Sequence, residues 1–269
     1  MTTRMAVLAL LLPCSGAFAG TTLTMKNAKG GESTLFLDRN KMRTVDARPE
    51  KSESSMMYDG DAQKMFLIDP AKKTYTVITP ARMKAKMDEA RASMKASMAK
   101  MPAEQRAQMQ AAMEKMDPET RKRMEAMMSG QAARPATPAQ KTRYEKTGSS
   151  QTVAGYRCEG YRQVTGDKVG MAGCFIPWSA GAVSKEDLGS FEKIREFMRE
   201  GGQGMMDGAA MLQVAEMPGF PAKWGPPGKE GSDEARMTLV SIKRGSVPAD
   251  TFKGPAGYAE KDFGEKEER

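Results

Sequence analysis

The segment from Met83 to Met128 contains eleven methionines and no Leu, Ile, Val, Phe, Trp or Tyr. Its other residues are mainly Ala, Lys, Arg, Glu and Gln, which favour helices. The methionines before Pro102 recur at spacings of three, four or seven residues, which predicts that one helix face carries them. They are Met83, Met87, Met94, Met98 and Met101. Because thioether side chains are flexible and polarisable, such a surface favours a binding role over a catalytic one.

Two prolines, Pro102 and Pro118, divide the methionine-rich segment. Asp117-Pro118-Glu119 has the residues preferred at a helix start, with Asp as the N-cap and Pro at the first helical position. The pattern predicts three successive helical pieces in an insertion over residues 81–130. A Pro- and Ala-rich linker over residues 131–140 is expected to follow it.

Polar and apolar residues alternate with period two between Thr21 and Thr79, before the insertion. Pairs of turn-forming residues interrupt the alternation at Arg39-Asn40, Asp59-Gly60 and Asp69-Pro70. Short alternating runs separated by turns predict an antiparallel meander.

Strands are predicted again from Lys141 to Tyr161, from Phe220 to Trp224 and from Met237 to Ile242. Between them, Ser184 and Asp187 fit a helix start related to the capping box. An apolar stripe at helical spacing follows, consisting of Leu188, Phe191, Ile194, Phe197 and Met198. The sequence therefore predicts one further amphipathic helix, ending near Gly201.

Residues 1–19 have the features of a secretory signal peptide: Arg4, the apolar run Ala6–Leu12, and Ala17-Phe18-Ala19 before Gly20. The apolar run is too short to span a bilayer, and no later run of about 18 apolar residues occurs. We therefore expect an exported protein without a transmembrane span. The formal net charge of +8 favours peripheral contact with an anionic membrane. The sequence has no stripe of alternating basic and aromatic residues, so we do not expect a nucleic-acid site.

Two cysteines, Cys158 and Cys174, remain once the signal peptide is removed. Thr165 to Lys168 is a turn signal between two strand-like runs, and a hairpin around Gly166 would place the two cysteines roughly opposite each other. Facing positions on antiparallel strands are close enough for a bridge, allowing for a bulge. Export to an oxidising compartment then makes a Cys158–Cys174 disulfide the expected state.

The chain contains no histidine. This excludes a Ser-His-Asp triad, a Cys-His pair and a His-ligated zinc site. No local pair of carboxylates stands out from the solvated charges, so neither an enzymatic activity nor a cofactor is expected.

Three interpretations of the methionines stay open. They could pack as ordinary core against the β domain, or line or cover a cavity for an apolar ligand. They could also bind Cu(I), because a spacing of four residues places two soft thioethers on one helix face. The pairs for that alternative are Met83/Met87, Met94/Met98 and Met109/Met113.

Three motifs resemble those of an exported bacterial family of unknown function, family 4412. They are Val153-Ala154-Gly155-Tyr156 with Cys158; Asp69 with Lys73 and Tyr75; and Pro248 with Phe252, followed by Pro255, Gly257 and Tyr258. The resemblance covers most of the mature chain, from Gly20 to Tyr258.

That family is similar in fold to the LolA and LolB lipoprotein carriers and to RseB-like proteins. The resemblance implies an α+β architecture, a curved antiparallel sheet forming an unclosed half-barrel around helices. The expected organisation is a single LolA-like β domain over residues 20–258, interrupted by the methionine-rich insertion and its linker. A charged tail over residues 259–269 completes the chain.

These observations together predict a periplasmic, non-enzymatic protein that binds a lipid, an acyl chain or a hydrophobic protein segment. One alternative is a periplasmic Cu(I)-binding protein. The other is an envelope module, structural or sensory, that docks an envelope protein through its methionine-rich helices. The expected ligand-binding residues are Met83, Met87, Met94, Met98, Met101, Met109, Met113, Met116, Trp178 and Trp224.

Overall fold

A computed structural model describes residues 20–48, 51–102, 142–201, 216–226 and 237–264, with scattered positions between 104 and 121. The expected signal peptide (1–19) and linker (131–140) lie outside these ranges. Within the described part, no helix is long and apolar enough to cross a membrane.

The first half of the sheet is an antiparallel meander of six strands. They are β1 (Gly20–Asn27), β2 (Glu32–Asp38), β3 (Lys41–Arg48), β4 (Lys51–Asp59), β5 (Lys64–Asp69) and β6 (Thr74–Ile78). The predicted turn residues hold three of the connections. Arg39 adopts a positive φ of 50° between β2 and β3. The carboxylates of Asp59 and Asp69 accept hydrogen bonds from the N–H groups of Ala62 and Lys72, each at 3.1 Å.

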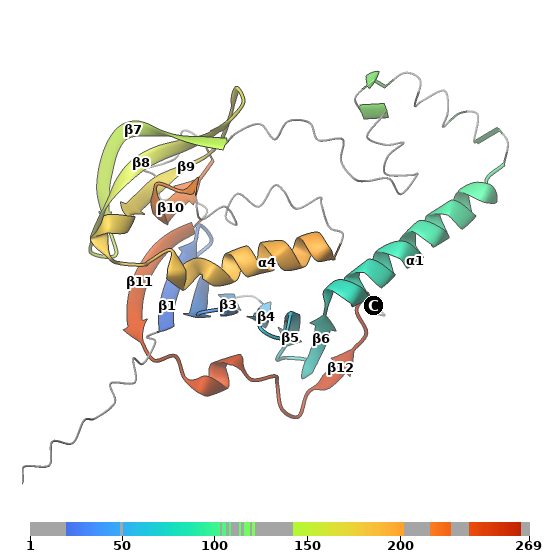
Figure 1. Cartoon of the computed structure of the whole chain (residues 1–269), viewed down its shortest axis with the longest axis horizontal. Coiled ribbons are helices and arrows are strands. Elements are labelled where there is room, and N and C mark those ends of the chain that lie inside the picture. Colours follow the sequence, from blue (N-terminus) through green and yellow to red (C-terminus); the bar gives the residue numbers. More distant parts are fainter. Residues whose placement is uncertain are drawn as a thin grey trace, which may run out of the picture.

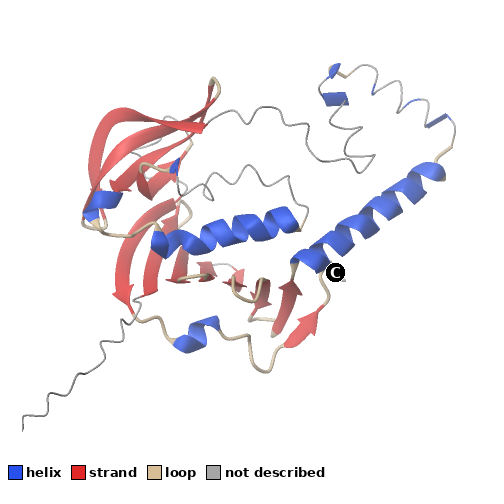
Figure 2. Ribbon diagram, viewed as in Figure 1, coloured by secondary structure: helices blue, strands red, loops and turns tan. Residues whose placement is uncertain are grey.

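A second set of strands completes the sheet. They are β7 (Thr142–Val153), β8 (Tyr156–Thr165), β9 (Lys168–Pro177), β10 (Gly219–Gly225), β11 (Met237–Gly245) and the short β12 (Ala259–Lys261). The strand order is β12-β6-β5-β4-β3-β2-β1-β11-β10-β9-β8-β7, so β11 pairs with β1 and joins the two halves. Every pairing is antiparallel except that of β12 with β6. The sheet is curved and unclosed, which confirms the α+β half-barrel (Figures 1 and 2).

The predicted disulfide joins Cys158 on β8 to Cys174 on β9, with their Cα atoms 5.4 Å apart. The hairpin between these strands turns at Gly166, whose φ is 61°. Cys174 lies opposite Gly160 in the β8–β9 register, so the cysteines are diagonal neighbours. The expectation of a bridge across this hairpin is therefore confirmed.

The second predicted helix is α4 (Gly189–Glu200), preceded by a 3-10 turn (Glu186–Leu188). The predicted reciprocal cap forms at this 3-10 turn: the Ser184 N–H donates to the Asp187 carboxylate at 2.8 Å, and the Asp187 N–H donates to Ser184 Oγ at 3.2 Å. In Figure 1, α4 crosses the inner side of the curved sheet.

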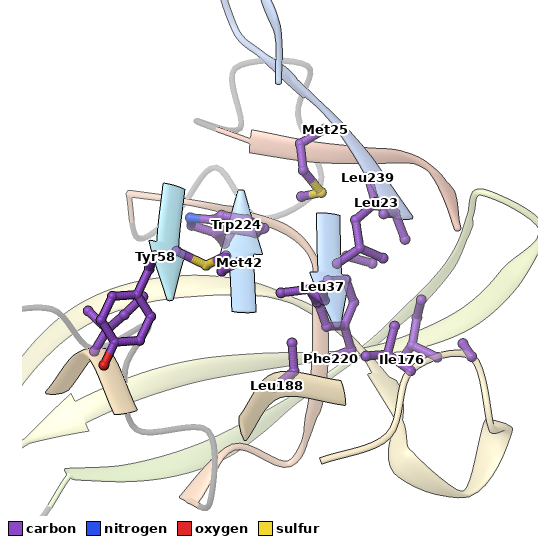
Figure 3. Packing of buried hydrophobic residues seen from close by; sticks show 14 of the residues in the cluster. Leu23, Met25, Leu37, Met42, Tyr58, Ile176, Leu188, Phe220, Trp224 and Leu239 are labelled. Carbon is purple, nitrogen blue, oxygen red and sulfur yellow. The ribbon is translucent and has the colours of Figure 1, made fainter. Parts of the chain in front are cut away.

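The core lies between α4 and a row of directly opposed residues that crosses five strands. The row consists of Leu37, Met42, Tyr58, Met65 and Ile78, all buried. The rings of Tyr58 and Phe197 of α4 meet edge to face at 5.5 Å, and the Tyr58 hydroxyl donates to the Lys193 carbonyl at 3.0 Å. Figure 3 shows Leu23, Leu37 and Leu188 in the same cluster.

The C-terminal segment runs from β11 past β3 and β4 to the β6 edge. A 3-10 turn (Ala249–Phe252) packs near β3, where the Arg43 guanidinium donates to the Thr251 carbonyl at 2.9 Å. The segment assigned from sequence to a charged tail begins in β12, which pairs with β6. Residues after Gly264 lie outside the described part.

Candidate functional site

The methionine-rich insertion begins as α1 (Pro80–Ala99). Thr79 caps it, since Thr79 Oγ1 accepts the Arg82 N–H at 3.2 Å, and Pro80 occupies the first helical position. Further along, the predicted helix start at Asp117 is also formed, with the Asp117 carboxylate accepting the Thr120 N–H at 2.9 Å.

The first turn of α1 is fastened to the body. Met83 is only 3% exposed and packs against Gly201, where an added Cβ would collide with the Met83 sulfur. The Arg82 guanidinium pairs with Glu260 of β12 at 2.7 Å, and this carboxylate raises the pKa of Arg82. The base of the helix is thus held between α4 and the C-terminal segment.

Beyond its first turns α1 leaves the body (Figures 1 and 2). Met94 is 54% exposed, more than the exposed sheet residues Leu67 (44%) and Val240 (45%). Met87 is half-buried, as are Met101, Met113 and Met116. Met109 and the side chain of Met98 lie outside the described part. The structure thus divides the predicted methionine face: Met83 belongs to the core, and Met94 faces away from it.

A small apolar hollow lies in the second half of the sheet. It is lined by Tyr144, Gln163, Met171, Ala172, Phe175, Met217, Pro221 and Trp224. Its free volume is about 20 Å³, which is room for about one water molecule. The rings of Tyr144 and Phe175 meet edge to face at 5.6 Å, and burial raises the pKa of Tyr144. The lining can thus recognise apolar surface through aromatic and thioether groups.

The two predicted tryptophans have different surroundings. Trp224 is buried in the core and lines the hollow. Trp178 is half-buried; its Nε1–H donates to the Met217 carbonyl at 3.0 Å, and Lys185 Nζ lies 5.8 Å from its ring centre. Trp178 therefore holds the backbone of a residue that lines the hollow, without lining the hollow itself.

The family model described as Domain of unknown function (DUF4412) matches residues 79–258. The chain belongs to this family. The match begins immediately before α1 and contains both α1 and the hollow, while β1 to β6 precede it. The expected membership is therefore confirmed.

Other comparisons give no closer assignment for this DUF4412 protein. No relative was found among the curated proteins. The solved structure described as "Structure of PNGF-II in C2 space group" is similar at 8% identity, over 91% of this chain and 31% of that chain, with a TM-score of 0.34. The chain thus spans about a third of that protein. A likeness to LolA or LolB stays a prediction.

Sequence reasoning missed most of the hollow. Tyr144, Met171, Phe175 and Met217 were not among the predicted binding residues. Tyr144 lies on β7, Met171 and Phe175 lie on β9, and Met217 lies just before β10. Alternation shows which residues of one strand share a face, but only the strand order shows which strands meet. The two alternative functions of the methionine-rich segment, copper binding and partner docking, stay predictions. Among the described residues, no group of three or more Cys, Asp or Glu side chains is placed to hold a metal.

Proposed function

We propose that this protein is a periplasmic, non-enzymatic binding protein for an apolar ligand, either a lipid or acyl chain or a hydrophobic protein segment. The observation that carries the proposal is the apolar hollow beside Trp224, whose lining contains three aromatic rings and two methionines. The LolA-like interpretation of the unclosed sheet agrees with it, since a curved sheet offers an apolar inner face. The absence of histidine from the chain supports a role without catalysis.

The hollow must enlarge to accept such a ligand, because its present volume suits about one water molecule. Met171 and Met217 in its wall are unbranched and change rotamer at low cost. A buried chain of about ten methylenes gains about 8 kcal/mol before costs, the scale of a micromolar dissociation constant. Opening the wall would reduce this gain, so we expect weak to moderate affinity.

Trp224 gives a direct test, since the chain has two tryptophans and this one lines the hollow. The Trp178→Phe variant leaves Trp224 as the single tryptophan, and Trp224→Phe leaves Trp178 as the matched control. Titration with a brominated fatty acid should quench Trp224 saturably and more strongly than Trp178, because bromine quenches at contact range.

A filling variant completes the test. Ala172 is 2% exposed in the wall, so Ala172→Leu should occupy the space and weaken the quenching of Trp224. A folded Ala172→Leu variant that is quenched as strongly as its parent would contradict the proposal, as would a Trp224 signal that the brominated fatty acid leaves unchanged. Intact folding is checked by the urea midpoint.

A further inference from the structure

We propose that α1 is a membrane-contact helix that lies on an anionic phospholipid surface through its methionines and the basic residues beside them. This proposal does not depend on the apolar hollow. It rests on the direction of α1, on the exposure of its distal turns and on its charge.

The helix is fixed at one end and free along the rest. Met83 and Arg82 fasten the first turn to the body through Gly201 and Glu260. Every residue from Asp88 to Ser97 is exposed, and α1 extends away from the sheet (Figure 2). From Met87 to Ala99 the free part is about 20 Å long at about 1.5 Å per residue. This length is available for contact with a flat surface.

Apolar and basic residues form two parallel lines on this free part. Met87, Ala90 and Met94 follow at spacings of three and four residues, which places them on one line of the helix. Lys84, Arg91 and Lys95 form the second line, at spacings of seven and four. Around the helix axis, the second line lies within about 100° of the first, because each residue is rotated by about that angle from the one before it.

The charge of α1 is complementary to an anionic surface. The helix contains five basic and two acidic residues, for a formal charge of +3. Lys86 pairs with Glu89 at 2.8 Å, and Arg91 with Asp88 at 3.4 Å. Lys84 and Lys95 have no ion-pair partner in the described part of the chain. They are exposed and long enough to extend beside a thioether that enters the lipid interface.

The composition of the helix favours a bilayer over a protein groove. Protein partners are anchored mainly by Trp, Tyr and Arg in fitted pockets, and α1 contains no aromatic residue. A second copy of the same helix would bring like charges together. A bilayer requires no shape complementarity, and its anionic headgroups attract the basic residues beside the exposed methionines. Because the face opposite the methionines is largely alanine, the apolar contrast is modest, and binding should depend strongly on charge and salt.

Sedimentation of the full chain with vesicles tests the proposal. The chain should bind vesicles of phosphatidylcholine mixed with phosphatidylglycerol, and release them at high salt, while binding phosphatidylcholine vesicles far less. Each basic residue near such a surface strengthens partition about fivefold. Lys84→Gln with Lys95→Gln should therefore weaken partition by at least about tenfold.

Matched variants distinguish an effect of α1 itself from the effects of net charge and of exposed apolar residues elsewhere. Lys29→Gln with Lys64→Gln removes the same charge from exposed turn and strand positions and should change partition much less. Met94→Ser should weaken partition severalfold and Met94→Leu should restore it, whereas Leu67→Ser on the sheet should have little effect.

The proposal is wrong if the wild-type chain binds neither vesicle, or binds both equally. It is also wrong if the Lys29 and Lys64 substitutions weaken partition as much as those at Lys84 and Lys95. Failure of these tests leaves the quenching experiment on Trp224 unaffected, because that assay uses a soluble fatty acid. An acidic protein would become the occupant to test if vesicles are not bound.

Discussion

Replacing Met83 by alanine should destabilise the protein, whereas the same replacement at Met94 should not. The two methionines lie on one predicted helix face, but Met83 is 3% and Met94 54% exposed. Full burial of a Met side chain contributes about 1.5–3 kcal/mol, and core Met→Ala substitutions cost about 2–5 kcal/mol when the cavity is included. Because the base of α1 can shift toward Gly201, we expect about 2–3 kcal/mol for Met83→Ala. For Met94→Ala we expect a change within about 0.5 kcal/mol, as for other exposed sites.

Urea unfolding followed by tryptophan fluorescence measures both values. The slope m should stay constant, so that the midpoint reports stability alone. Met83→Leu is the control for side-chain identity and should cost less than about 1.5 kcal/mol, since it conserves volume. Equal losses at Met83 and Met94 would refute the reasoning, because they would mean that the distal turns of α1 also pack against the body. A Met83→Ala variant with an unchanged free energy of unfolding would refute the reasoning as well.

Three further predictions concern the disulfide, Asp187 and the oxidation of Met94. Reduction of the Cys158–Cys174 bridge, which closes a loop with a sequence separation of 16, should lower the free energy of unfolding by about 3 kcal/mol in calorimetry under reducing conditions. Burial alone would raise the pKa of Asp187, but hydrogen bonds from Ser184 and Arg244 hold it below the ordinary value. The stability that these hydrogen bonds give is therefore present above pH about 3.9, and it is lost as acid protonates the folded Asp187 carboxylate. Asp187→Asn should make the free energy of unfolding depend less on pH in this acid range. Mild peroxide should convert Met94 to its sulfoxide well before buried Met57, as judged by peptide mass spectrometry, and similar rates would contradict the exposure difference.

Local sequence signals predicted the parts of the fold that local chemistry determines. The carboxylates of Asp59 and Asp69 hold the turns at which the alternation broke. Ser184 and Asp187 bond to each other at the 3-10 turn that leads into the second helix. In each case the partners are at most three residues apart, so the sequence contains the whole interaction. The disulfide was predictable for a related reason, because Gly166 fixed the hairpin that brings the cysteines together.

The remaining features depend on partners distant in the chain. The period of the methionines could not separate Met83 from Met94, because Gly201, which covers Met83, lies more than a hundred residues later. The pairing of β11 with β1, which joins the halves of the sheet, is also non-local. The hollow beside Trp224 exists only once that strand order is formed. Side-chain periodicity therefore predicted which residues share a face but not what covers that face.

The division of the methionines has a physical consequence for any role of the insertion. A leucine stripe on α1 would gain so much from burial that the free turns would tend to fold back onto the body or to aggregate. Methionine with alanine and lysine gives helical propensity with a weaker drive for burial. The helix can therefore stay extended while Met83 and Arg82 anchor its first turn. Substituting leucine for methionine along the whole free part should accordingly increase self-association measured by sedimentation, even where the single Met94→Leu change does not.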